Sequence, residues 1–264
     1  RVSYNTDMSN YFLTTYQNYL YADAEAVKGR STKTYNRVIS YTLNQILTWA
    51  KSFGSHRISL LAGHENYEYT WSNVTATRTG FTVPTTELVA ASVAEGSNSY
   101  SDEYAIEGYL FRGDYNFADK YYLSGSFRTE GSSRFFSDVR WGNFWSLGGS
   151  WRITQESFMD NLGWIDDLKL KASFGEQGND DIGNYYGWQS LFSISGRNNG
   201  NYNGALHSQL ENKNLQWEKN SNLNVGLDFS FLNRFTGTVE YFMRNSSNLL
   251  FSVPLPQSTG ISSN

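Results

Sequence analysis

The sequence predicts an all-β fold, an antiparallel up-and-down transmembrane β-barrel. Three observations lead to it: a composition rich in aromatic residues and glycine, repeated alternation of apolar and polar residues, and connections of alternating length. Of the 264 residues, 17% are aromatic, and the chain contains 19 tyrosines, 17 phenylalanines and 23 glycines but only 3 prolines. Aromatic residues favour strands and glycine favours turns, so this composition is typical of β-rich proteins.

Alternation with period two marks about eight segments, as expected for strands with two different faces. They are 35–49, about 56–71, 109–117, 121–130, 145–153, 168–174, 220–231 and 235–244. The segment 121–135 reads YYLSGSFRTEGSSRF. We expect one of its rows to face lipid (Tyr121, Leu123, Gly125, Phe127) and the other a wet interior (Tyr122, Ser124, Ser126, Arg128, Glu130).

Alternation alone also fits a soluble β-sandwich, which has one buried face and one wet face. The lengths of the connections favour the barrel. The expected links 51–55, 118–120 and 232–234 are short, and 72–102, 131–143 and 176–216 are long. Outer-membrane barrels gather short periplasmic turns at one rim and long extracellular loops at the other.

The link 154–167 is longer than the other links on the short side. We expect a short helical turn there, capped by Thr154, with Phe158 and Leu162 on one face.

Several aromatic residues lie near the predicted strand ends: Tyr41, Trp49, Tyr121, Trp145 and Trp151. They fit the aromatic girdles of membrane proteins, where the ring is apolar and its polar atom reaches the headgroups. The other interpretation is that they form the core of a sandwich.

Composition and motifs exclude several classes of function. A net charge of -4 without a Lys/Arg cluster argues against a nucleic-acid surface. Cys 0 excludes a disulfide scaffold and a thiolate zinc site. No apolar run is long enough for a transmembrane helix. His56, His64 and His207 have no metal-ligand spacing, and there is no Gly-x-Ser-x-Gly motif, so we expect neither an enzyme nor a bound cofactor.

Four segments carry a resemblance to a known family: FRTEGSSRF (127–135), RWGNFWSLGGSWRITQESFM (140–159), LKASFGEQGNDDIGNYYGWQSL (170–191) and LENKNLQWEKNSNLNVGLDF (210–229). In this order they resemble the SusC/RagA family of TonB-dependent outer-membrane transporters of Bacteroidetes. The resemblance runs from about Arg37 to the end of the chain.

The resemblance implies a barrel of about 22 strands around an N-terminal plug. It also implies a SusD-like surface lipoprotein as a lid, and import of oligosaccharides or peptides driven through the TonB–ExbB–ExbD complex. The location it implies is the bacterial outer membrane.

The chain departs from the complete family pattern. Its start shows neither a plug nor a TonB-contacting segment, and its end, 260–264, lacks the terminal aromatic strand usual in outer-membrane barrels. An open sheet would also leave two edges of unpaired backbone groups, which lipid cannot satisfy. We therefore expect residues 1–264 to be a portion of the barrel domain, with the plug and the C-terminal strands lying elsewhere.

Candidate substrate-binding residues come from a long loop and from the wet face. They are Tyr185, Tyr186 and Trp188, whose rings suit stacking on sugar rings, and Arg112, Asp114, Arg128 and Arg134, which suit hydrogen bonding to hydroxyl or peptide groups. The alternative interpretation is structural: the aromatic residues pack the loop, and the charges pair across the wall, as Arg112 would with a carboxylate on a neighbouring strand.

The loop segment GEQGNDDIGN suggests a weak calcium candidate, formed by Glu176, Asp180 and Asp181. A set of turns stabilised by Asx and Gly residues explains the same segment, and it is the interpretation we favour.

Two functional alternatives to an active importer stay open. One is a soluble β-sandwich module that binds glycans through its aromatic residues. The other is a passive porin-type channel, which would lack the plug.

Overall fold

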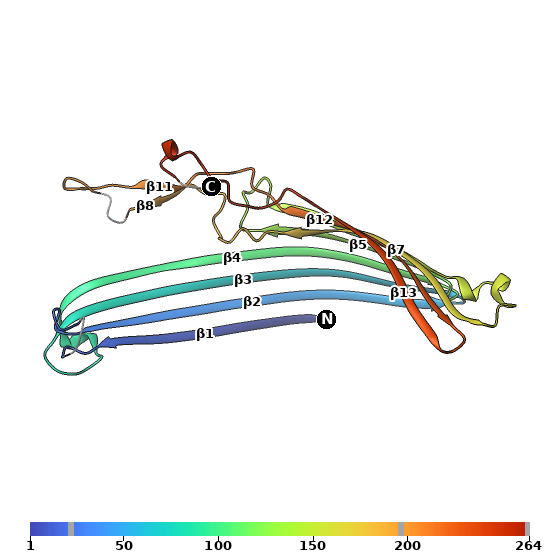
Figure 1. Cartoon of the computed structure of the whole chain (residues 1–264), viewed down its shortest axis with the longest axis horizontal. Coiled ribbons are helices and arrows are strands. Elements are labelled where there is room, and N and C mark those ends of the chain that lie inside the picture. Colours follow the sequence, from blue (N-terminus) through green and yellow to red (C-terminus); the bar gives the residue numbers. More distant parts are fainter. Residues whose placement is uncertain (21–23, 195–197, 262–264) are drawn as a thin grey trace. The chain divides into compact units, whose positions relative to one another are not determined.

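The computed structural model describes residues 1–20, 24–194 and 198–261. Nine strands form one sheet in the order β1-β2-β3-β4-β5-β6-β7-β12-β13, so almost every strand pairs with its neighbour in sequence (Figure 1). The strands are β1 (Val2–Gln17), β2 (Arg30–Phe53), β3 (His56–Phe81), β4 (Ala91–Phe117), β5 (Tyr121–Ser132), β6 (Trp141–Arg152), β7 (Ile165–Asn179), β12 (Glu218–Phe231) and β13 (Phe235–Ser247). The predicted antiparallel up-and-down sheet is confirmed.

The link between β7 and β12 contains two small hairpins. β8 (Leu191–Ser193) pairs with β11 (Leu206–Gln209), and β9 (Asn198–Asn199) pairs with β10 (Tyr202–Asn203). Short 3-10 turns are η2 (Leu88–Ala90), η3 (Ile153–Gln155), η4 (Ser157–Met159) and η5 (Gln257–Thr259). In the described part of the chain, no helix is both long and apolar enough to cross a membrane.

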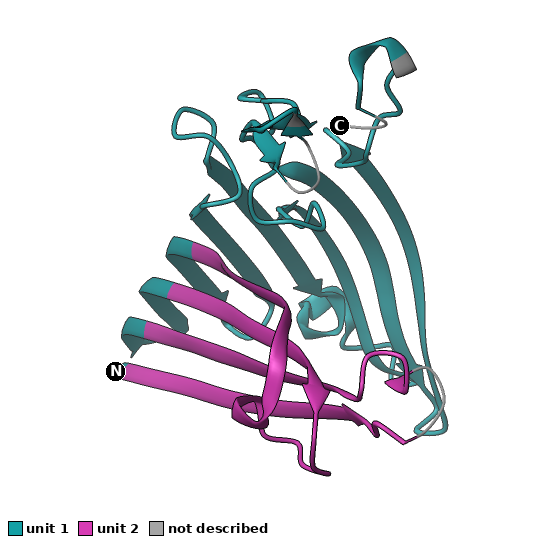
Figure 2. Ribbon diagram, turned by 90° about the vertical axis from the view of Figure 1, so that its left-hand side faces the viewer, with its two compact units in different colours: residues 1–2, 44–66, 106–264 teal, residues 3–43, 67–105 magenta. Residues whose placement is uncertain are grey.

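The chain divides into two compact units (Figure 2). Unit 1 contains residues 1–2, 44–66 and 106–264, and unit 2 contains residues 3–43 and 67–105. The strands β2, β3 and β4 are 24, 26 and 27 residues long, and each contributes to both units.

In unit 1 the register separates the side chains into an apolar face and a polar face. One row of directly paired residues across β5, β6, β7, β12 and β13 is Gly125, Leu147, Phe174, Leu223 and Met243. A row on the opposite face is Ser124, Gly148, Ser173, Asn224 and Phe242. The two rows predicted for 121–130 therefore lie on opposite faces, and each continues across the neighbouring strands.

The apolar face of unit 1 is not covered by other described residues. Leu147 is 52% exposed, Val225 39% and Val239 65%. A β-sandwich would bury this row between two sheets, because burial of such side chains is what stabilises a sandwich. The sandwich interpretation is therefore wrong.

The short links are tight turns, as predicted. Ala118 and Asp119 both have positive φ, and Lys120 N donates to Phe117 O at 2.9 Å, which defines a type I′ turn. Leu232 and Asn233 repeat this conformation in the turn between β12 and β13.

The link after β6 contains the two 3-10 turns η3 and η4, which agrees with the predicted short helical turn but not with its predicted cap. Thr154 does not cap: its hydroxyl donates to Asp167 Oδ1 at 3.0 Å, and no side chain caps η3. Because this hydroxyl bonds to the start of β7, it fastens the link to the sheet.

The expected loop 72–102 is also wrong, since β3 continues to Phe81 and β4 begins at Ala91. Most of this segment is strand with polar or small residues on both faces, such as VTATRTG at 74–80. Alternation disappears when both faces meet water, so the pattern did not reveal these strand halves. The strand β1 was missed as well.

Aromatic rings form a chain along the apolar face at the tight-turn end of unit 1. Ring centroids are 5.1 Å apart for Phe53 and His56, 4.8 Å for His56 and Phe117, 6.3 Å for Phe117 and Tyr121, and 6.5 Å for Tyr121 and Trp151. The predicted position of Tyr121 and Trp151 near strand ends agrees with this chain of rings.

Glu156, between η3 and η4, anchors the same ring chain. It accepts hydrogen bonds from Tyr121 Oη at 2.5 Å and Trp151 Nε1 at 3.0 Å, and Lys120 Nζ lies 3.4 Å away. These donors, Tyr121 first, hold the pKa of Glu156 below its usual value.

Trp145 does not lie at a strand end. It pairs with Phe127 in the middle of β6 and lines a depression of about 700 Å³ on the apolar face, together with Trp49. The cross-strand pair Gly113 and Gly125 leaves this part of the face without side chains. A second group of rings lies farther along the strands, where His64 and Trp141 flank Tyr109 at 4.8 and 6.3 Å.

A small hydrophobic core lies at the long-loop end of unit 1. Phe135, Phe144 and Trp217 are 0%, 5% and 5% exposed. Trp217 Nε1 donates to Arg140 O at 2.7 Å, which satisfies the polar atom of the buried indole. This core joins the β5–β6 link to the segment before β12.

Candidate functional site

The polar face of unit 1 carries a patch of small side chains, which we call the Ser/Gly patch. Its members on β5, β6 and β7 are Ser124, Ser126, Ser146, Gly148, Ser150, Ser173 and Gly175. Ser126 and Ser146 are direct cross-strand partners, and their hydroxyl oxygens are 2.7 Å apart. The patch presents hydroxyl groups and backbone without bulky side chains.

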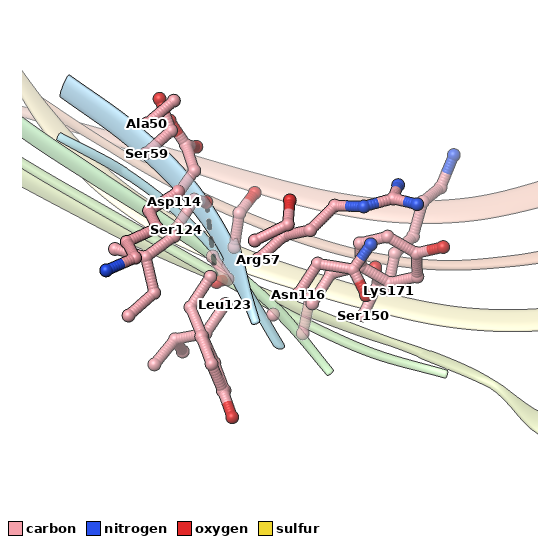
Figure 3. Close-up of a pocket in the computed structure, with 18 residues that line it drawn as sticks. Ala50, Arg57, Ser59, Asp114, Asn116, Leu123, Ser124, Ser150 and Lys171 are labelled. Atoms are coloured by element: carbon pink, nitrogen blue, oxygen red, sulfur yellow. Dashed lines mark hydrogen bonds between the residues drawn. The ribbon is translucent and has the colours of Figure 1, made fainter. Parts of the chain in front are cut away.

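An open cavity of about 550 Å³ lies over one part of this patch. Its lining includes Ser124, Ser150 and Ser173 from the patch. Figure 3 shows polar side chains of Arg57, Asn116 and Lys171 extending along one side of the strands, with Leu123 on the other side. Asp114 also lines the cavity, which is therefore bordered by positive, negative and neutral polar groups.

Lys171 forms the centre of an ion-pair network beside this cavity. Its Nζ lies 3.0 Å from Asp228 Oδ1 and 2.6 Å from Glu240 Oε1. Lys171, Gly226 and Glu240 are directly opposite one another on β7, β12 and β13. A Cβ atom at Gly226 would lie 2.5 Å from Lys171 Cε, so the glycine gives the lysine side chain its path.

A second open cavity, of about 610 Å³, lies on the same face closer to the long loops. Arg128 lines it, with Nη2 2.6 Å from Glu130 Oε1 and 3.4 Å from Glu65 Oε1. Asn222 and Asn224 on β12 add amide groups to the lining. These groups suit hydrogen bonding to a polar ligand.

Arg112 and Asp114, the other predicted strand residues, form an ion pair with each other. Arg112 Nε donates to Asp114 Oδ2 at 2.9 Å, along a single strand. The expected partner of Arg112 on a neighbouring strand is therefore wrong. Residue parity places both side chains on the polar face, because Asp114 pairs with Ser124.

The remaining predicted residues lie in the loops and connect them. Arg134 Nη1 is 3.1 Å from Asp181 Oδ1 and donates to Asp180 O at 3.1 Å. Its guanidinium carbon lies 5.2 Å from the centre of the Tyr185 ring. Arg134 thus fastens the β5–β6 link to the start of the β7–β12 link.

The predicted loop aromatic residues pack against their surroundings. Trp188 lies 5.2 Å from Phe136, ring centre to ring centre, and the rings of Tyr185 and Tyr186 are 6.5 Å apart. Trp188 is half-buried. The structure therefore divides the predicted residues into a strand group (Arg112, Asp114, Arg128) and a loop group (Arg134, Tyr185, Tyr186, Trp188).

Two carboxylates of the weak calcium candidate already bind other groups of the protein, which would compete with a calcium ion. Asp181 faces Arg134, and Asp180 Oδ2 accepts a hydrogen bond from Ser132 Oγ at 2.6 Å. Glu176 lies within β7. In residues 1–20, 24–194 and 198–261, no three His, Cys, Asp or Glu side chains gather in a way that suits a metal ion.

Alternation alone did not reveal the role of Lys171 and Gly226. It marked 168–174, 220–231 and 235–244 as strands, but the register across these three strands decides which of their side chains meet. Alternation identifies a face and not the partner on the next strand.

The comparisons with known proteins agree with this architecture. Residues 1–263 match the family model described as TonB dependent receptor-like, beta-barrel. The chain is 31% identical over 231 residues to the TonB-dependent receptor SusC of Bacteroides thetaiotaomicron, a match that covers 85% of this chain and 23% of SusC. A TonB-dependent receptor of Formosa agariphila is 37% identical over 164 residues, which are 60% of this chain and 15% of that receptor.

A solved structure of the RagAB peptide transporter matches with a TM-score of 0.89 and 27% identity, over 99% of this chain and 30% of that one. The chain thus spans less than a third of the length of these relatives. They are receptors and transporters, not enzymes, and their family is located in the outer membrane. The chain belongs to the TonB-dependent receptor β-barrel family, as a barrel segment of the SusC/RagA type.

Proposed function

We propose that the protein imports large nutrients across the bacterial outer membrane, and that residues 1–264 form part of the wall of its barrel. In this proposal the apolar face meets lipid and the polar face lines the lumen. The barrel has about 22 strands around a plug, and TonB and ExbB–ExbD supply the energy from outside this segment.

The separation of the two faces is the observation that carries the proposal. On β4, the apolar face between Tyr109 and Phe117 carries Phe111, Gly113 and Tyr115 and no charged group. Crossing a bilayer takes about 9–11 strand residues, which is the length between these two ring groups. The exposed apolar rows would be unfavourable in water and are favourable in hydrocarbon.

The Ser/Gly patch and its bordering charges suit the passage of a polar solute. Small hydroxyl side chains offer hydrogen bonds without obstructing the lumen, and the charges of Arg112, Arg128 and Lys171 are already paired with carboxylates. We propose that Arg112, Asp114 and Arg128 contact substrate inside the barrel. Arg134, Tyr185, Tyr186 and Trp188 would contact it at the loops.

A SusD-like surface lipoprotein is the proposed partner at the long-loop end. Its support is the membership of the chain in the SusC/RagA family, for which such a lipoprotein is expected. The loops that would meet the lipoprotein are held by the core of Phe135, Phe144 and Trp217. A rigid loop base is suited to a repeated opening and closing contact.

An uptake assay tests the proposal and separates it from a passive channel. Cells that express the full-length protein receive labelled oligosaccharides or peptides, with and without a protonophore, and in a strain that lacks TonB. Active import predicts that uptake stops in both conditions. Uptake that continues unchanged without TonB would support a passive channel instead.

A further inference from the structure

Unit 2 contains an aromatic strip that no part of the proposed site uses. In β3 the sequence Tyr67-Glu68-Tyr69-Thr70-Trp71 places three rings at alternate positions, so they share one face. Tyr104 lies 6.1 Å from Tyr67, and Tyr100 lies 4.8 Å from Trp71, between ring centres. We call these five residues the aromatic strip: Tyr67, Tyr69, Trp71, Tyr100 and Tyr104.

Hydroxyl and amide groups continue the same face beyond Trp71. Asn73, Thr75 and Thr77 have the parity of Trp71, and they hydrogen-bond across to β2. The pairs are Asn73 with Asn36 at 2.6 Å, Thr75 with Thr34 at 3.1 Å and Thr77 with Thr32 at 2.9 Å. The aromatic strip therefore leads directly into a ladder of neutral polar groups.

The strip is accessible and carries little charge. Tyr100 is 52% exposed, and the other four rings are half-buried. From Tyr67 to Thr77 this face of β3 has no charged side chain, and on β4 the carboxylate of Asp102 lies between Tyr100 and Tyr104 in sequence. On β3 the strip has the parity of Arg57, Ser59 and Glu65.

We propose that the aromatic strip and the adjoining Asn/Thr ladder bind a neutral oligosaccharide. Sugar rings have apolar faces, which aromatic rings cover, and hydroxyl edges, which amides and hydroxyls bind. Rings at alternate strand positions are about 6.6 Å apart, so an extended polymer would meet a series of equivalent contacts. A peptide would bring charged termini and side chains, for which this face has no matching set of charges.

The inference rests on the proposed import function, since it names the substrate class, but it is tested without transport. The full-length protein in detergent is titrated with neutral oligosaccharides prepared from starch, cellulose, xylan, mannan and levan, and with a tryptic peptide mixture. Calorimetry reports binding. At least one oligosaccharide series should bind.

The variants Trp71→Ala and Tyr67→Ala should weaken this binding by about tenfold each, the effect of losing a well-packed aromatic contact. Trp71→Phe keeps a ring and should keep most of the affinity. The matched control is Tyr35→Ala on β2, because Tyr35 lies between Thr34 and Asn36 in sequence and packs on Phe12 at 4.7 Å, on the opposite face. Circular dichroism checks that each variant retains its strands.

Three results would overturn the assignment: no binding of any oligosaccharide by the wild type, binding of peptides alone, or equal losses in Trp71→Ala and Tyr35→Ala. A failure of import in cells with binding intact would refute the transport proposal and leave the binding site in place.

Discussion

Lys171 Nζ reaches Glu240 Oε1 at 2.6 Å, two strands away, because the residue between them in the register is Gly226. Neighbouring strands are about 4.8 Å apart, so the Lys171 side chain must lie flat across β12 to reach β13. Any side chain at position 226 would occupy this path. The relationship connects three strands on the polar face through one pair of charges.

Gly226→Ala should therefore displace the Lys171 side chain. It should not prevent folding, because the new Cβ meets Lys171 Cε, which is near the end of a flexible side chain. Lys171 would leave Glu240, and its reactivity toward a water-soluble amine reagent, read by mass spectrometry, should rise severalfold. Gly96→Ala is the control, because nothing lies within 4 Å of a Cβ at that position. Unchanged reactivity in Gly226→Ala would refute this role of the glycine.

The core at the long-loop end should govern the stability of the loops. Trp217→Ala or Phe144→Ala removes a large side chain that is 5% exposed, and such changes cost about 3–5 kcal/mol. Hydrogen–deuterium exchange should show a comparable loss of protection in 133–140, 180–194 and 198–217 and little change in the tight turns. Phe192→Ala, at a side chain 55% exposed, is the control and should leave protection intact.

The pair Arg30 and Glu95 in unit 2 predicts a pH dependence. Arg30 donates two hydrogen bonds of 2.6 Å to Glu95, which lowers the pKa of that carboxyl group. A group with a lowered folded-state pKa stabilises the fold above its unfolded pKa, and this stabilisation disappears as pH falls through the folded-state pKa.

The thermal midpoint of the wild type should therefore exceed that of Arg30→Gln at neutral pH, and the gap should close in acid, below the ordinary glutamate range. A gap of constant size across the titration would show that the pair does not act through the Glu95 charge.

The turn between β12 and β13 places Leu232 at φ 58, a conformation that costs a side-chain-bearing residue about 1–2 kcal/mol. Leu232→Gly should relieve this cost and raise the free energy of unfolding by up to about 1 kcal/mol, after the entropy of the glycine is deducted. Leu227→Gly, within β12, should lower it. Equal losses from both changes would contradict the strained turn.

Alternation predicted most of unit 1 because its two faces have different surroundings. The rows of Val225 and Asn224 follow directly from the sequence and appear on opposite faces of β12. Unit 2 was harder, since residues 72–81 of β3 and 91–102 of β4 have no continuous apolar row, and 72–102 therefore resembled a loop. Where the environment is the same on both faces, period two carries little information.

The candidate site shows a similar limit. Sequence identified Arg112, Asp114 and Arg128 as polar-face residues, but only the register shows their partners. Arg134, Tyr185 and Trp188 were selected as substrate residues, and their contacts fasten the loops to one another. Long-range contacts of this kind depend on loop conformation, which no periodic pattern encodes.

The most direct test of the account is the accessibility of two adjacent residues in β12. Val225 and Asn224 are neighbours in sequence and lie on opposite faces. Residues 1–264 contain Cys 0, so a single cysteine introduced at either position is the only one in this segment that can react with a maleimide. The full-length protein, freed of any other cysteine and placed in lipid vesicles, is exposed to a water-soluble maleimide and to a lipid-soluble one. We predict that Val225→Cys reacts with the lipid-soluble reagent alone and that Asn224→Cys reacts with the water-soluble reagent. Reaction of Val225→Cys with the water-soluble reagent at the rate of Asn224→Cys would contradict a lipid-facing sheet.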